Sequence, residues 1–119
     1  MIYSSKSTEL ITIKNCYDGD TCTTNKGEKI RLACIDAPEM IGSKSEPIAA
    51  LAAKEYLNKL IGGKEVTIRR IRKDRYGRTV AELSKRKMNV QKELFKRGFA
   101  KIYQHYENQC EWSKRKDDF

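Results

Sequence analysis

The order of short β-prone segments around one long helical pattern is the feature that most constrains how this chain can fold. Five runs have strand character, at residues 10–15, 21–24, 29–35, 65–71 and 78–83. Turn-forming sequences separate several of them, at residues 17–20, 25–28 and 74–77. One helix follows the third strand and another follows the fifth. This order predicts a mainly β or α+β fold, a five-stranded barrel of the OB type with two or three short helices, rather than a doubly wound sheet.

The two helical segments carry recognisable start and stop signals. Ser43 and Glu46 resemble a capping box, and Pro47 suits a first-turn position. The apolar side chains that recur at helical spacing are Ala49, Ala53, Tyr56, Leu57 and Leu60. The pair of glycines at 62–63 is expected to end this helix. Asn89 predicts the start of the second helix, which should end at Gly98, and residues 99–106 are expected to be extended.

The length of 119 residues fits one domain, so we expect residues 1–119 to form a single unit. The recognisable motifs lie within residues 10–106, and residues 107–119 form a short tail with no clear period. No apolar stretch approaches the ~18 residues needed to span a bilayer. Residues 1–9 are polar and lack a signal-peptide core. The sequence leaves the location open: secreted or periplasmic if a leader has been removed, and cytoplasmic otherwise. We expect a monomer.

The charge balance favours polyanionic partners. There are 25 Lys and Arg residues against 16 Asp and Glu residues, which gives a net charge of +9. The excess is concentrated in residues 64–78 and 85–97. DNA and RNA are the expected partners, while a solvated basic surface with no partner explains the charge alone equally well. The basic residues do not face a long apolar helical stripe, which disfavours binding to a membrane surface.

The cysteine pattern leaves the redox state open. None of the four cysteines forms a C-x-x-C pair, and the single histidine, His105, stands five residues before Cys110. This is poor spacing for a zinc site. Cys16, Cys22 and Cys34 lie in strand-like segments, where a free cysteine commonly acts as a small core residue. A disulfide is the alternative, but it cannot be assigned from the sequence.

Three segments contain candidate chemical groups, and each also has a plain structural explanation. Residues 18–21 read Asp-Gly-Asp-Thr, which is either an Asx turn or a carboxylate turn suited to calcium or magnesium. Residues 31–39 carry Arg31 before a mostly apolar run and end in Asp36 and Glu39 around a proline bend. These side chains are either a guanidinium and two acids at the rim of a site or a strand cap with surface acids. In an uninterrupted strand, alternate residues from Arg31 to Ile35 would share one face.

The third segment, residues 74–78, reads Asp-Arg-Tyr-Gly-Arg. It is either an ordinary basic turn or an aromatic face with two guanidinium groups placed around a nucleotide. Taken together with Gly-Phe-Ala-Lys at residues 98–101, the three segments occur in an order and spacing that resemble the thermonuclease (staphylococcal nuclease-like) family. The resemblance covers about residues 11–106. It implies an OB-fold barrel and a calcium-dependent endonuclease that cleaves DNA and RNA with little sequence specificity, leaving 3′-phosphate ends.

The resemblance also implies a role for each matching residue. The metal, calcium or another divalent cation, would be bound by the carboxylates of Asp20 and Asp36 and the backbone carbonyl of Ala37. Glu39 would be the general base, and Arg31 and Arg78 would hold the phosphate. The nucleotide would be contacted by Arg75, Tyr76 and Tyr106, whereas Asp18 matches a turn residue. These roles are chemically coherent, because a cation and two arginines stabilise charge that develops on a phosphate, and a carboxylate can take a proton from water.

The sequence departs from the family pattern in three places. Residues 40–46 are short, which trims one loop that faces the substrate, and Gln104 stands where an aromatic residue is expected. Residues 110–119 are too short for most of a final helix. Two alternatives remain: a catalytically silent binding module on the same barrel, and an unrelated OB-type binder of single strands. The silent module is disfavoured because all the acids and arginines are present, and the unrelated binder would need exposed aromatics along its sheet.

Overall fold

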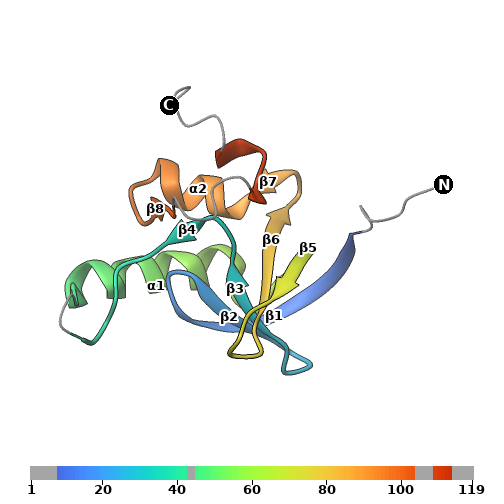
Figure 1. Ribbon diagram of the computed structural model, residues 1–119, viewed down its shortest axis with the longest axis horizontal. Helices are drawn as coiled ribbons and strands as arrows, with labels where there is room; N and C mark the ends of the chain where they lie inside the picture. The colour runs from blue at the N-terminus through green and yellow to red at the C-terminus, as the bar shows by residue number, and fades with distance from the viewer. Residues whose placement is uncertain (1–7, 43–44, 104–108, 114–119) are drawn as a thin grey trace.

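The computed structural model describes residues 8–42, 45–103 and 109–113. Five strands form a closed mixed barrel: β1 (Glu9–Asp18), β2 (Thr21–Thr24), β3 (Lys29–Leu32), β5 (Glu65–Lys73) and β6 (Thr79–Lys85). Three strands of two residues each are β4 (Ile35–Asp36), β7 (Met88–Asn89) and β8 (Lys101–Ile102). The helices are α1 (Pro47–Ile61) and α2 (Val90–Lys96), as Figure 1 shows. The predicted OB-type barrel is confirmed.

The barrel closes through a parallel pairing between β3 and β6. The other barrel strands pair antiparallel in the order β3-β2-β1-β5-β6, and the register of the closing pair sets Arg31 opposite Val80. Because β6 begins directly after the turn at residues 74–78, this pairing carries that turn to the side of β3. Two segments that are more than 40 residues apart in the sequence therefore meet at one edge of the barrel.

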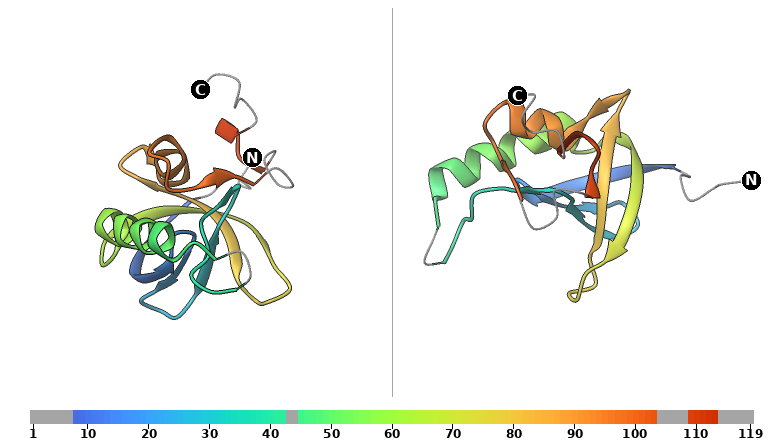
Figure 2. Two further views of the ribbon diagram at one scale, coloured as in Figure 1. Left: turned by 90° about the vertical axis from the view of Figure 1, so that its left-hand side faces the viewer. Right: turned by 45° about the horizontal axis from the view of Figure 1, so that its top comes forward.

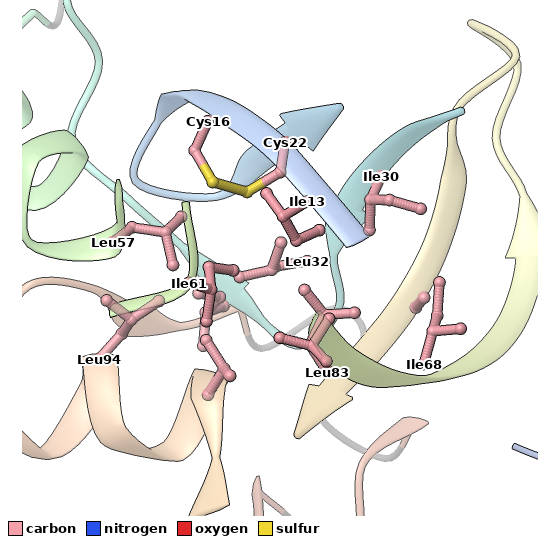
Figure 3. Close-up of a cluster of buried hydrophobic side chains, with 14 of the residues drawn as sticks. Ile13, Cys16, Cys22, Ile30, Leu32, Leu57, Ile61, Ile68, Leu83 and Leu94 are labelled. Atoms are coloured by element: carbon pink, nitrogen blue, oxygen red, sulfur yellow. A yellow bond between two sulfur atoms is a disulfide. The ribbon is translucent and has the colours of Figure 1, made fainter. Parts of the chain in front are cut away.

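A continuous apolar core fills the barrel and extends to both helices. Figure 3 shows Ile13, Ile30 and Leu83 from the strands packed towards Leu57 of α1 and Leu94 of α2. All five side chains are fully buried. Burial of such side chains is the main stabilising contribution to a domain of this size.

The two helices lie side by side against the barrel, as the left view of Figure 2 shows. Tyr56 of α1 stacks on Phe99, which follows α2, with ring centroids 4.5 Å apart, and its hydroxyl donates to Glu93 of α2. Pro47 occupies the first turn of α1, as predicted. The capping box is not observed: the N-cap is Glu46, its side chain makes no capping hydrogen bond, and Ser43 lies outside the described residues. Within the described part of the chain, neither helix is long and apolar enough to cross a membrane.

The prediction of one strand over residues 29–35 is wrong. The strand ends at Leu32, and Cys34 adopts a left-handed backbone conformation with φ of 73° before β4 begins. The expected alternation from Arg31 to Ile35 on one face is therefore lost. The Arg31 guanidinium instead lies against the break, where Nη1 donates to the carbonyl oxygens of Leu32 at 2.6 Å and of Ile35 at 2.9 Å.

All four cysteines are joined in disulfides, so of the two alternatives that the sequence left open, Cys16, Cys22 and Cys34 are not free core thiols. Cys16–Cys22 links β1 to β2 inside the core, and Cys34–Cys110 links the break after β3 to the C-terminal segment. The second disulfide holds residues 109–113 against the barrel, where Ser113 is fully buried. The part of the predicted tail that the structure describes is thus a packed element.

Candidate active site

Asp20 lies in the tight turn between β1 and β2. Its side chain is 10% exposed, and Oδ2 accepts a hydrogen bond of 2.8 Å from the backbone N–H of Ala37. Asp18 acts as the turn residue, because its Oδ1 accepts from the backbone N–H of Asp20 at 3.0 Å. Burial raises the pKa of Asp20 to about 6, although Arg31 opposes the rise. The ionised form of this carboxyl is therefore short of positive charge.

Gly19 allows this turn to approach the segment that follows β4. A Cβ atom at this position would lie 2.7 Å from the Cβ of Ala37 and 2.7 Å from the Cβ of Ala53 in α1. Side chains do not tolerate contacts that short, so any larger residue would push the turn outward. The glycine is thus required by space at the point where Asp20 reaches the backbone of Ala37.

Arg31 lies between the two carboxylates that the sequence assigns to a metal. Its Nη2 atom is 3.6 Å from Oδ2 of Asp20 and 3.4 Å from Oδ1 of Asp36. The side chain of Asp36 is 58% exposed, whereas that of Asp20 is buried. Since Nη1 is already held by the carbonyls at the β3–β4 break, the guanidinium is fixed in place before any ligand arrives.

The turn at residues 74–78 is organised by Asp74. Its Oδ1 accepts from the backbone N–H groups of Tyr76 and Arg78, and its Oδ2 accepts from Nε of Arg78 at 2.7 Å. Burial acts to raise the pKa of Asp74, but these hydrogen bonds outweigh it and lower the pKa. The exposed Tyr76 ring lies beneath two guanidinium groups, 5.1 Å from that of Arg75 and 5.3 Å from that of Arg78. Asp74 thus binds Nε of Arg78, and the two terminal amino groups of Arg78 are the atoms that can bind an anion.

These elements enclose a cleft of about 670 Å³, a size suited to a nucleotide. Six of the residues singled out in the sequence line it together: Arg31, Asp36, Glu39, Arg75, Tyr76 and Arg78. Asp20 and Ala37 are not among the lining residues. Asp20 contacts Arg31, which lines the cleft, and Ala37 directly follows Asp36, which also lines it. Tyr106 and Gln104 fall outside the described residues.

Sequence reasoning missed several residues of the cleft. Tyr103 faces Arg31, with the guanidinium carbon 6.0 Å from the ring centroid, and Gln109 also lines the cleft. Gln109 is held there by a 2.8 Å hydrogen bond from Arg69 to its carbonyl oxygen and by the neighbouring Cys34–Cys110 disulfide. Tyr103 follows β8, whose pairing with β4 could not be read from a local pattern. Asp74 could have been found, because an Asp that opens a turn commonly binds backbone N–H groups two residues on.

Comparison with known proteins agrees with this geometry. The family model for staphylococcal nuclease homologues matches residues 29–118. The chain belongs to this family. An uncharacterized endonuclease of Haemophilus influenzae is 42% identical over 93 residues, covering 75% of this chain and 49% of its own length. An uncharacterized endonuclease of Escherichia coli O157:H7 is 33% identical, covering 75% and 58%. A probable staphylococcal-like nuclease of rice (Oryza sativa subsp. japonica) is 36% identical, covering 75% and 25%.

The chain thus spans about half the length of the bacterial relatives that it matches. Membership of the staphylococcal nuclease homologue family also excludes the unrelated single-strand binder. Within the described residues, no group of three His, Cys, Asp or Glu side chains is placed to hold a metal ion. Asp20 and Asp36 still fit a hard divalent cation, because they are oxygen donors and Arg31 offsets only part of the cost of burying the charged form of Asp20. A cation there would need a backbone oxygen and water to complete its ligands.

Proposed function

We propose that this member of the staphylococcal nuclease homologue family is a calcium-dependent nuclease that hydrolyses phosphodiester bonds of DNA and RNA with little sequence specificity. The supporting observation is that Arg31, Asp36, Glu39 and Arg78 line one cleft. A phosphodiester is an anion, and attack by water adds negative charge to its oxygens. Guanidinium groups that are held in place, one on β3 and one directly before β6, stabilise that charge without having to reorganise.

The two arginines are fixed in different ways, and this suggests separate tasks. Arg31 uses Nη1 on two backbone carbonyls and Nη2 on two carboxylates, so it is held rigidly next to the acids. Arg78 is anchored through Nε to Asp74, and its terminal amino groups can form two parallel hydrogen bonds with phosphate oxygens. Arg31 would then bind the phosphate oxygen nearest the acids, while Arg78 would bind the other oxygens of the same phosphate.

Glu39 is the candidate general base. It lies in the exposed segment after β4, lines the same cleft, and directly follows Pro38. Its backbone is tied down, because its carbonyl oxygen accepts a 2.8 Å hydrogen bond from the N–H of Glu46 at the start of α1. A carboxylate held at this position can accept the proton of an attacking water molecule.

Asp20, Asp36 and the carbonyl of Ala37 would hold the calcium ion. When bound, the ion supplies positive charge that stabilises the anionic phosphate during attack. The two carboxylates would then be neutralised by the cation as well as by Arg31. The assignment is supported by the burial of Asp20, since its ionised form is stabilised only in part by Arg31 and by the N–H of Ala37.

Little sequence specificity is expected because the contacts available to a substrate are mostly charged. Arg72, Arg75 and Arg78 line the cleft and suit phosphate groups, while Tyr76 offers an exposed ring on which any base can stack. Affinity for substrate should therefore fall steeply with salt concentration. Cleavage that leaves a 3′-phosphate is expected from the family resemblance.

The direct test is degradation of single-stranded DNA with calcium and then with excess chelator. Cleavage should appear with calcium and vanish with chelator. Replacing Glu39→Gln should lower kcat by roughly 10²- to 10⁴-fold, and Arg78→Lys should lower it by roughly 10²- to 10³-fold. A folded protein that binds DNA but cleaves it under neither condition would instead be the silent binding module.

Matched controls separate catalysis from general charge effects. Arg97→Lys is the control for Arg78→Lys, because Arg97 also donates through Nε to an acid four residues earlier, Glu93, at 2.7 Å. Glu55→Gln on the exposed face of α1 is the control for Glu39→Gln. Both controls should retain wild-type rates. Equal rates in the test variants and their controls would contradict the assigned roles.

A further inference from the structure

A second group of cations lies at the end of the barrel away from the cleft. Lys64, Lys85, Arg86 and Lys87 make up this group, named here the basic end. The first three line a hollow of about 580 Å³ that contains a single acidic residue, Glu65. Most of the arginines in the sheet and the cleft form ion pairs with acids, but no salt bridge is formed by any residue of the basic end within the described parts of the chain.

Two ammonium groups of the basic end share one small region. Lys64 donates to the carbonyl oxygen of Lys59 at 2.8 Å, and Lys85 donates to that of Leu60 at 3.3 Å. The carbonyls at the end of α1 attract both lysines, but each ammonium has three donors and these contacts use one. Burial lowers the pKa of Lys85, and the charges of Lys64 and Arg86 lower it further. An anion bridging these groups would relieve the repulsion.

The turn between β6 and β7 supports an anion site independently of the two lysines. Arg86 and Lys87 both have left-handed backbones, with φ of 50° and 72°. A two-residue hairpin of this kind strongly favours Asn-Gly, because other residues are strained there. Placing two long cations at this turn sacrifices local stability and presents both charges to solvent, where both residues are exposed. Strain kept at such a position indicates a function for the side chains.

The basic end and the cleft lie at opposite ends of the same strand. Figure 1 shows β6 running from the β5–β6 turn at its lower end to the β6–β7 turn at its upper end. The seven residues of β6 span roughly 20 Å. At ~3.4 Å per nucleotide along one strand of B-form DNA, that distance corresponds to about six nucleotides. One strand could therefore contact both ends at once, whereas a dinucleotide could not.

We propose that the basic end is an anion-binding exosite that holds the phosphodiester backbone of the same nucleic-acid strand whose scissile bond lies in the cleft. The ligand is a chain of phosphates, so it is recognised by charge and spacing rather than by base sequence. The choice of a nucleic acid as the ligand rests on the proposed function. It predicts that the protein binds and cleaves strands of about six nucleotides or more better than shorter ones.

The decisive variant is Arg86→Asn with Lys87→Gly. It removes two cations and introduces the residues that the turn geometry favours, so its melting temperature should be unchanged or higher. The matched control, Lys14→Gln with Lys26→Gln, removes two exposed cations from β1 and from the β2–β3 turn. Both variants lose two positive charges, so any difference in their affinity for DNA is due to where on the surface those charges lie.

Binding is measured by fluorescence anisotropy with a labelled 12-nucleotide DNA, a labelled dinucleotide and, in competition, inorganic phosphate. All measurements contain chelator, so failure of cleavage cannot be confused with failure of the exosite. The Arg86→Asn/Lys87→Gly variant should bind the 12-nucleotide DNA roughly fivefold more weakly, with a slope against salt smaller by about 2, one for each lost phosphate contact. Its affinity for the dinucleotide should not change.

Two results would overturn the proposal. In the first, the test variant and its control bind the 12-nucleotide DNA alike. In the second, the test variant loses affinity for inorganic phosphate and the dinucleotide as much as for the long strand, which would make the basic end a site for a small anion.

Discussion

Replacement of Asp20 by asparagine should stabilise the protein at neutral pH while removing its response to metal. The pKa of the Asp20 carboxyl rises from 3.8 to about 6 because burial penalises its charge. At ~1.36 kcal/mol per pKa unit, this rise corresponds to about 3 kcal/mol lost from the free energy of unfolding once the group is ionised. Asp20→Asn removes that charge. The amide oxygen can still accept from the N–H of Ala37, so we expect a gain of about 1–3 kcal/mol at pH 7.5.

The sign of the pH dependence follows from proton binding. The folded protein keeps a proton on Asp20 up to a pH of about 6, whereas the unfolded chain loses it near 3.8. Between these values the folded state binds more protons, so the contribution of Asp20 to stability falls as pH rises. The advantage of Asp20→Asn should therefore be absent near pH 3.8, grow through this window and become constant above pH 6.

The assay is urea unfolding followed by the fluorescence of the single tryptophan, Trp112, which packs against the ring of Phe95. Curves are recorded with chelator from pH 4 to 7.5 and repeated at pH 7.5 with calcium. Calcium should stabilise the wild type and have no effect on Asp20→Asn, because a ligand that binds only the folded state raises its stability. Asp36→Asn is the control, because it removes a carboxylate that also contacts Arg31 but is 58% exposed.

One result would refute this reasoning. If Asp20→Asn destabilises the protein at pH 7.5 in chelator, the ion pair with Arg31 stabilises the folded protein by more free energy than burial of the charge costs. The ionised carboxylate would then be a structural group, and the argument that it requires an added cation would fail.

Two further predictions concern the frame of the site. Replacing Cys34 and Cys110 by serine should lower the free energy of unfolding by about 4 kcal/mol, and replacing Cys16 and Cys22 by about 2 kcal/mol, because the first pair closes a much longer loop. Urea unfolding of both double variants checks the order, and equal losses would contradict it. Gly19→Ala should destabilise the protein by about 1–3 kcal/mol through overpacking against Ala37 and Ala53, and calcium titration of activity should show weaker metal binding. An unchanged titration would mean that the turn moves without displacing Asp20.

Much of the barrel could be predicted from the sequence because its signals are local. Strand runs, the glycine turns and the second helix with its Asn89 cap all depend on neighbouring residues, and Asn89 does accept from the backbone N–H of Lys92. The break after β3 could not be predicted. It depends on the guanidinium of Arg31 binding two carbonyls and on a disulfide to Cys110, and both are contacts made only in the folded chain.

The candidate site shows the same division. The motifs indicated which residues are candidates for the chemistry, but not that Asp20 is buried and supported by Ala37, which depends on the space left by Gly19. Nor could they place Arg31 beside the turn at residues 74–78, since the parallel pairing of β3 with β6 leaves no sequence pattern. Gln109 lines the cleft because a hydrogen bond from Arg69 and the neighbouring disulfide hold it there, and both contacts exist only in the folded chain.

The Cys34–Cys110 disulfide makes one wall of the cleft dependent on an oxidising environment. Cys34 follows the strand that carries Arg31, and Cys110 holds Gln109 at the edge of the cleft. Cellular thiols keep such pairs reduced in the cytosol, while secreted and periplasmic proteins retain them. The proposed lack of sequence preference would make the enzyme a danger to the chromosome of the cell that makes it. This wall of the cleft would be complete only in an oxidising compartment, where the disulfide forms. The enzyme would then be fully assembled only away from the chromosome of its own cell.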